Sequence, residues 1–462
     1  MSPAAEPSGT TSPTPEEVSD RLRDEGVEYL FGAYVDVYGV PKSKCVPIDW
    51  LPQAAAGSER YTVGALEGMG DLGPNEDECC GIPDLGAVTV LPWDRRFAIA
   101  PADLIFEGSP YSHDSRHVLK RQLAQAKKMG YQAQAGIEPE IYLLREREDG
   151  GIEPWVSDDL LNKPTRGYDV EATIAADRFL LPMVSYMDEL GWQVYSFDHE
   201  GGDGQYEFAF MHCDALEMAD RMLVFRLMAK HVARQIGAFV TFMPKPFDSS
   251  FGSGAHLNFS LVDADTSETV FATDNGDGTV SHLPLALSFT AGVLEHCDAI
   301  TALACSTVNS YKRLLPVGLM NEISWAPVFR AYGENNRTLM CRLPANRPCI
   351  ELRTADSASN AYLVMAMMIA AGLDGIEREL DPGAPVNSDT YKMSDDELAE
   401  AGVLRLPENL GAATEAFEAS ELAKRVMGEE FHRSFVEQKK KEWLEYNTVV
   451  GGWERDMYLR LW

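Results

Sequence analysis

The segment AGIEPEIYLL at residues 135–144 carries two carboxylates, Glu138 and Glu140, in a run that is otherwise apolar. The pattern predicts a half-buried strand, and alternate side chains of a strand point to one face, so the two carboxylates should converge. Two like charges this close repel unless one is protonated, a cation lies opposite, or a metal ion binds between them. A solvated strand face is the plain alternative, because Asp and Glu together number 72 in this chain.

Three further segments that are predicted to contain strands carry groups of the same kind. DHEGGDGQYEF places Glu200 before a glycine-rich turn and Glu207 after it, so a hairpin would bring these two carboxylates together. SGAHLNFS carries His256, and CIELRTAD carries Glu351 close to Arg353. Each has a structural explanation, namely charged flanks of a turn, a hydrogen-bonded core histidine and a surface ion pair. Together, five carboxylates and one imidazole form an oxygen-rich ligand set that suits Mg²⁺ or Mn²⁺.

The composition indicates a soluble globular protein of two or three domains, with 462 residues of which 45% are hydrophobic. The net charge of −32 argues against nucleic acid or an anionic membrane as a partner. The eight cysteines form no C-x-x-C pair, which favours reduced thiols and a cytoplasmic location. The longest apolar run, residues 361–373, is shorter than the ~20 residues of a membrane span and predicts a buried helix.

The predicted elements divide the chain into a tail and two folded parts. Residues 1–17 are rich in Pro, Ser and Thr, which predicts a disordered tail. Residues 18–107 carry short β signals, beginning with two strands joined by a turn at Tyr38 and Gly39. Residues 108–462 alternate helices with strands, which predicts an α+β domain. Its predicted elements are a helix near 115–129, the strand with Glu138 and Glu140, a helix near 170–190, strands at GQYEFAF and AHLNFSL, and a helix from 214 to about 237.

Seven ordered blocks of the sequence resemble the glutamine synthetase family. They are GIEPEIYL, HEGGDGQYEF, TFMPKPF followed by GSGAHLNFS, NSYKRLLP, NNRTLMCRLP, IELRTAD followed by NAYL, and WERDMYL. The resemblance implies a small N-terminal β-grasp domain over 18–107 and a large glutamine-synthetase-type catalytic domain over 108–462. It also implies an active site between the small domain of one subunit and the large domain of its neighbour. We therefore expect a ring-shaped homo-oligomer, a dodecamer of two stacked hexamers.

The resemblance assigns roles in phosphoryl transfer from ATP to the γ-carboxylate of L-glutamate. Two or more Mg²⁺ or Mn²⁺ ions are implied; the ligands are Glu140, Glu200 and Glu207 for one ion, and Glu138, His256 and Glu351 for the second beside the ATP phosphates. Planar guanidinium groups suit the anionic substrates. The implied substrate contacts are Arg337 and Arg342 to the ATP phosphates, Asn258 and Ser260 in the nucleotide pocket, Arg313 and Gly252 to glutamate, and Arg353 to its γ-carboxylate.

The nitrogen donor is where the chain departs from ammonia-using members of the family. Gly64 stands where those members have an aspartate, and Trp325 stands where they have a glutamate on a mobile flap. Two anionic groups for ammonium are therefore absent, and glycine with tryptophan is expected to offer room and an aromatic wall for an alkylammonium. Glu67 is the candidate for steering the amine or taking its proton, with a surface glutamate as the alternative. Trp325 at this position resembles γ-glutamylmethylamide synthetases and relatives that act on ethanolamine or polyamines.

Three functions therefore remain open. A ligase for a small primary amine, ethanolamine or methylamine, is favoured, because Glu67 is the one replacement acid and a polyamine's second ammonium would need its own partner. An ammonia-using glutamine synthetase or a γ-glutamylpolyamine synthetase is the alternative enzyme, and a structural relative without activity is the third option. Tyr391 lies near the position at which some bacterial relatives are adenylylated, but DTYKMSDDEL matches that site poorly, so we expect no such regulation.

Overall fold

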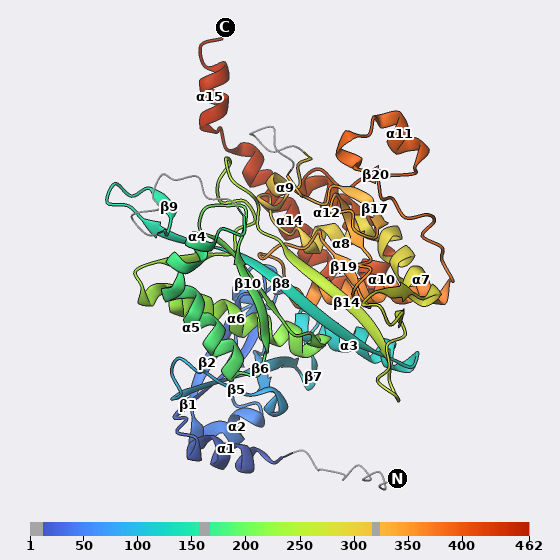
Figure 1. Cartoon of the computed structure of the whole chain (residues 1–462). Helices are drawn as coiled ribbons and strands as arrows, with labels where there is room; N and C mark the ends of the chain where they lie inside the picture. Colours follow the sequence, from blue (N-terminus) through green and yellow to red (C-terminus); the bar gives the residue numbers. More distant parts are fainter. Residues whose placement is uncertain (1–12, 157–166, 317–323, 462) are drawn as a thin grey trace.

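The computed structural model describes residues 13–156, 167–316 and 324–461. A smaller N-terminal part lies at the bottom of Figure 1, the larger part lies above it, and the last helix projects from the opposite end. Of the predicted tail, residues 1–12 lie outside the described residues. The prediction that this tail ends at residue 17 is wrong, because helix α1 (Pro15–Asp24) begins at Pro15. Thr14 accepts a hydrogen bond from the Glu17 N–H and donates its own N–H to the Glu17 carboxylate, a capping box that starts the helix early.

The smaller part is built on a sheet of mixed direction. The two predicted strands are confirmed as an antiparallel pair, β1 and β2, joined by a turn in which the Asp36 carboxylate accepts from Tyr38 N–H and Val40 N–H. β1 also runs parallel to β6, and the β-grasp assignment of this part stays a prediction. The strands of this sheet are β1 (Tyr29–Val35), β2 (Pro41–Pro47), β3 (Arg60–Tyr61), β4 (Cys79–Pro83), β5 (Thr89–Val90), β6 (Phe97–Phe106) and β7 (Ser109–Pro110).

The larger part is built on a sheet in which β8 is the longest strand. Its main path, in spatial order, is β10 (Val194–His199), β11 (Gln205–Phe210), β8 (Tyr131–Glu146), β14 (Ala255–Asp263), β19 (Ile350–Leu352), β18 (Leu339–Arg342), β17 (Phe329–Gly333) and β20 (Leu404–Arg405). Three short strands also pair with β8: β9 (Ile152–Pro154), β12 (Cys213–Asp214) and β13 (Phe239–Thr241). β15 (Ala272–Asp274) and β16 (Val280–His282) form a separate hairpin. The predicted strands around residues 138, 207 and 256 are thus confirmed.

Helices cover the larger sheet, and α10 (Ala361–Glu377) is buried along most of its length, as predicted for residues 361–373. The single helix expected near 170–190 is two helices, α4 (Val170–Ala175) and α5 (Asp177–Glu189), which meet at Ala176. The remaining helices are α2 (Leu51–Ala55), α3 (Ser115–Lys128), α6 (Ala215–Gln235), α7 (Pro284–Glu295), α8 (Cys297–Ala304), α9 (Ser310–Arg313), α11 (Asp395–Glu400), α12 (Leu410–Ala419), α13 (Glu421–Met427), α14 (Glu429–Thr448) and α15 (Gly452–Tyr458). None of the helices in the described ranges combines the length and apolar composition that a membrane crossing needs.

Candidate active site

The registers of neighbouring strands bring the predicted acidic residues to one place. On β8, Glu138 lies opposite His256 of β14, and Glu140 lies opposite Glu207 of β11. On the next pair, β14 and β19, the register brings Glu351 opposite Asn258. Residues two apart on a strand share a face, so these pairings gather the side chains on one face of the sheet.

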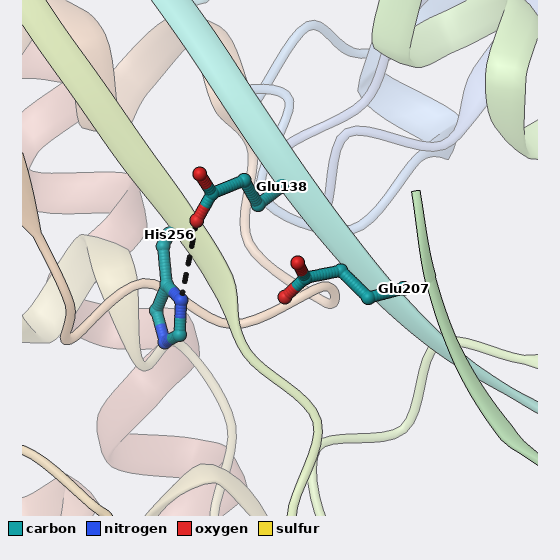
Figure 2. A group of neighbouring side chains, drawn as sticks. All are labelled: Glu138, Glu207 and His256. Atoms are coloured by element: carbon teal, nitrogen blue, oxygen red, sulfur yellow. Dashed lines mark ion pairs between the residues drawn. The ribbon is translucent and has the colours of Figure 1, made fainter. Parts of the chain in front are cut away.

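Glu138, Glu207 and His256 point toward one another in Figure 2, each from a different strand. One ligand atom from each of the three lies within 4.8 Å of the others. His256 Nδ1 lies 3.7 Å from Glu138 and 3.9 Å from Glu351, and its Nε2 lies 4.0 Å from Glu140. The structure therefore brings the imidazole and the carboxylates of three strands into one cluster, while their division into two metal sites stays a prediction.

A second group shares Glu207 with the first and contains a residue that the sequence reasoning missed. Asp198, Glu200 and Glu207 also offer ligand atoms within 4.8 Å of one another. Asp198 lies opposite Glu207 in the register of β10 and β11. The signal was in the sequence, because Asp198 precedes Glu200 by two residues, the same spacing that joins Glu138 and Glu140.

Glu140 is fixed at the buried end of the cluster. Its carboxylate accepts hydrogen bonds of 2.9 Å from Gln205 Nε2 and from the Gly254 N–H. A Cβ at Gly254 would lie 2.9 Å from Glu140 Oε1 and 3.0 Å from His256 Nε2. The loop before β14 therefore passes close to both side chains, and the Gly254 N–H holds the Glu140 carboxylate in place.

The cluster carries more negative charge than the fold neutralises at this end. Burial, followed by the charge of Glu200, raises the pKa of Glu140 to about 8. Burial, followed by Glu140, Glu138 and Glu200, raises the pKa of Glu207 to about 10. The pKa values of Glu200 and Asp198 are raised by burial and then by neighbouring carboxylates. Such a set of hard oxygen ligands fits divalent cations, which would favour the ionised forms.

The opposite end of the cluster is neutralised by arginines. Burial alone would raise the pKa of Glu351, but Arg353, His256 and Arg342 outweigh it and lower the value to about 2. Arg353 and Arg342 lie 2.5 Å and 2.7 Å from the Glu351 oxygens. The pKa of His256 is lowered by burial and then by Arg353, so the imidazole is neutral and free to act as a ligand.

A cavity of about 380 Å³ opens beside Glu138. Asn258 and Ser260, which were predicted to line a nucleotide pocket, both line it, together with Tyr195 and Arg347. Asn258 donates a 3.0 Å hydrogen bond to Glu138. This volume lies in the range of ligand pockets, ~300–1,000 Å³. The cavity therefore connects the predicted nucleotide residues with the carboxylate cluster.

The residues predicted to bind glutamate border the same cluster. Arg313 is buried and donates to the carbonyl oxygens of Thr354 at 2.9 Å and of Arg353 at 3.0 Å. A Cβ at Gly252 would lie 2.5 Å from the Arg313 side chain, so the loop carrying Gly252 passes directly over the guanidinium stem. The Gly252 carbonyl accepts from Gln205 Nε2, the group that also holds Glu140.

Trp325 lies on the other side of Arg353, whose Nη2 donates to the Trp325 carbonyl at 3.5 Å. Trp325 is 54% exposed and has φ +56°, a left-handed conformation that is strained for a tryptophan. It lines a cavity of about 500 Å³ together with Arg337 and Tyr391. The Tyr391 hydroxyl donates to the Ala326 carbonyl at 2.5 Å, which ties this loop to the chain after Trp325.

The small-domain residues predicted for the amine lie on a different element. Glu67 pairs with Lys441 of α14 at 2.7 Å and its side chain is about half exposed, which is compatible with the alternative of a surface glutamate. The expectation that Gly64 offers room is wrong within one chain. A Cβ at Gly64 would lie 2.1 Å from the Leu72 carbonyl oxygen, because the backbone of residue 72 passes directly against it. Whether Gly64 or Glu67 contacts an amine stays a prediction.

Comparison with known proteins agrees with this geometry. Residues 112–458 match the family model described as glutamine synthetase, catalytic domain. A glutamate–methylamine ligase from Methyloversatilis universalis is 36% identical over 96% of this chain and 99% of its own. A glutamine synthetase from Rhizobium leguminosarum bv. phaseoli is 35% identical over 95% of this chain and 98% of its own. A solved structure described as a GmaS/ADP complex has a TM-score of 0.86 and 34% identity, covering 96% of this chain and 99% of that chain.

The chain therefore belongs to the glutamine synthetase family, and it is a glutamate–amine ligase enzyme. Both predictions from the sequence, the family and the class of enzyme, are confirmed. Enzymes of this family use ATP and divalent metal ions, which agrees with the acidic groups around Glu207.

Proposed function

We propose that this protein ligates L-glutamate to a small primary amine, with ethanolamine or methylamine favoured, and that it does so through γ-glutamyl phosphate. ATP-dependent ligation of glutamate follows from the family. The observation that carries the proposal is the position of the carboxylate cluster between an arginine-rich wall and the cavity of about 380 Å³. Phosphoryl transfer between two anions requires such neutralising and positioning groups.

The nucleotide would lie in the cavity that Asn258 and Ser260 line, with its phosphates toward Glu138. Glu138, His256 and Glu351, and separately Glu140, Glu200 and Glu207 with Asp198 beside them, would hold the divalent cations. These cations would neutralise charge on the phosphates during transfer. Arg337 is exposed and lines the cavity of about 500 Å³ beside Trp325, from which it would contact the transferring phosphoryl group. Arg342 would support the site from its position on Glu351.

Glutamate would bind between the loop at Gly252 and the arginines beneath it. Arg313 would hold the α-carboxylate with the N–H groups that the Thr354 and Arg353 carbonyls leave free. Arg353 would orient the γ-carboxylate, because its guanidinium is fixed by Glu351 and by the Trp325 carbonyl. Attack by the γ-carboxylate oxygen on the terminal phosphorus of ATP forms γ-glutamyl phosphate and ADP. Attack by the amine nitrogen then forms the amide and releases phosphate, and the amine gives up a proton.

The choice of an organic amine rests on Trp325 and on the named relative that acts on methylamine. An indole wall next to Arg353 would bury the methylenes of an alkylammonium, and its face would add a cation–π contact of roughly 0.5–2 kcal/mol. Relatives named glutamine synthetase match at similar identity, so ammonium remains the alternative substrate. A polyamine is the third candidate substrate. Glu67 is the one acid proposed to steer the amine or accept its proton.

We also propose that the chain works as a ring-shaped oligomer, a dodecamer, located in the cytoplasm. The C-terminal segment supports self-association, because helix α15 projects from the body of the chain (Figure 1). This segment exposes large apolar side chains, which a free chain would leave in water. They are Val449, Val450, Trp453, Met457, Tyr458, Leu459 and Leu461.

The deciding experiment measures phosphate release with ATP, glutamate, Mg²⁺ and a panel of ammonium, methylamine, ethanolamine, putrescine and spermidine. We expect the highest kcat/KM with ethanolamine or methylamine. The highest value with ammonium would identify a glutamine synthetase, and the highest with putrescine would identify a polyamine ligase. Hydroxylamine serves as a small control nucleophile, and failure to form γ-glutamyl hydroxamate would refute glutamate activation itself. Mass photometry of the active fraction tests the oligomer, and an active monomer would refute a shared site.

A further inference from the structure

Arg347 differs from the other arginines around the cluster. Its Nη1 lies 3.1 Å from Glu138 Oε1, and its Nη2 lies 3.6 Å from Glu351 Oε2. Its side chain is 34% exposed, whereas those of Arg342 and Arg353 are 13% and 4% exposed. Arg342 and Arg353 are fixed by short ion pairs to Glu351, whereas the contacts of Arg347 are longer and its side chain is the most exposed of the three, so Arg347 can change its partner most easily.

Arg347 also lies at the junction of two sites. It lines the cavity of about 380 Å³ together with Asn258 and Ser260. At the same time it holds one oxygen of Glu138, while the other oxygen of Glu138 faces His256 at 3.7 Å. A divalent cation bound by Glu138 and His256 would neutralise the Glu138 carboxylate, which Arg347 otherwise neutralises. The guanidinium would then carry an unbalanced positive charge at the wall of the cavity.

We infer that Arg347 is a counter-ion that exchanges partners: it pairs with Glu138 and Glu351 before loading, and it contacts a nucleotide phosphate once Glu138 binds a divalent cation. The guanidinium fork suits a phosphate as well as a carboxylate, and charge-assisted contacts of this kind are the strong ones. This inference rests on the proposed function, because it requires a nucleotide in the cavity. It adds a phosphate-binding residue that competes with the cation in the unloaded protein.

The exchange predicts effects of opposite sign for one substitution. Arg347→Gln removes a charge that competes for Glu138, so Mg²⁺ alone should bind the nucleotide-free protein roughly 3- to 10-fold more tightly. The same variant lacks a phosphate contact, so ADP in the presence of saturating Mg²⁺ should bind roughly 10- to 100-fold more weakly. A residue that merely braces the loop would weaken both ligands.

Isothermal titration calorimetry on the full-length assembled protein measures both affinities directly. Arg96→Gln is the matched control, because it also removes one positive charge and Arg96 pairs with Asp94 at an exposed position outside the cavity and outside the acidic groups. Arg347→Lys keeps the charge and should restore part of the ADP affinity, which also guards against misfolding of the glutamine variant. Unchanged or jointly weakened binding in Arg347→Gln would overturn the inference while wild-type protein still binds ADP. Wild-type protein that binds no ADP would refute the proposed function as well.

Discussion

Glu207→Gln should stabilise the protein in the absence of metal while abolishing its activity. Glu207 lies among Glu138, Glu140, Glu200 and Asp198, and its pKa rises from 4.5 to about 10 through burial and these like charges. At pH 7 the folded chain must keep this carboxyl protonated, whereas the unfolded chain releases the proton. At pH 7 this proton difference destabilises the folded state by 2.303RT multiplied by the difference between pH 7 and the unfolded pKa of 4.5, or about 3 kcal/mol. The loss is smaller where solvent screens the partly exposed group.

The direction in which the stability changes with pH determines the conditions of the test. Because the folded pKa is raised, the contribution of Glu207 to stability is complete below pH 4.5 and is lost as the pH rises toward 10. Glutamine has no such titration, so the variant should exceed wild type at pH 7 in EDTA by roughly 2–3 °C in Tm, with little difference near pH 4.5. Excess Mg²⁺ should raise the Tm of wild type more than that of the variant, because the variant lacks a ligand.

Differential scanning calorimetry in EDTA and in Mg²⁺ at both pH values tests these expectations, with phosphate release measured in parallel. Glu408→Gln, at an exposed position, controls for the general effect of losing one negative charge. A Glu207→Gln protein that melts at or below the wild-type temperature in EDTA at pH 7 would refute the reasoning. Retention of more than about a tenth of the wild-type turnover would refute the role of Glu207 as a metal ligand.

Three further predictions follow from particular contacts. Binding of Mg²⁺ at pH 7 should release one to two protons per chain, because Glu140 and Glu207 have pKa values raised to about 8 and about 10. Calorimetry in buffers of different ionisation enthalpy measures the number of protons, and heats that do not depend on the buffer would contradict the prediction. Trp325→Ala should lower kcat/KM for methylamine and ethanolamine by roughly 2- to 30-fold, and an equal loss with ammonium would exclude a wall for the alkyl group. Arg116→Ala should destabilise the fold by about 3–5 kcal/mol in denaturant titrations, because Arg116 is buried between three aspartates. Arg96→Ala, at an exposed ion pair, should change the stability little, and equal effects of the two substitutions would contradict the importance of burial.

The strand alternation and the sequence blocks predicted most of the cluster. The i, i+2 rule placed Glu138 and Glu140 on one face from sequence alone, and the registers with β11 and β14 bear this out. The rule was applied to one pair and not to Asp198 and Glu200, so Asp198 was missed. Arg347 was missed for a different reason. It precedes β19 on an irregular segment, and no periodicity indicates that its guanidinium reaches Glu138 on a strand two places away in the sheet.

The residues predicted for the amine are held by different elements of a single chain. Glu67 pairs with Lys441 of α14, whereas the Trp325 carbonyl accepts from Arg353 in the large sheet, so different elements hold the two residues. Within one chain the backbone at Leu72 fills the space that a side chain at Gly64 would occupy, so the missing side chain leaves no open space there. If the site is shared between subunits, as proposed, Glu67 of one chain meets Trp325 of another. The selectivity for the amine is then a property of the assembly, and the spacing of residues 64, 67 and 325 in the sequence carries no information about it.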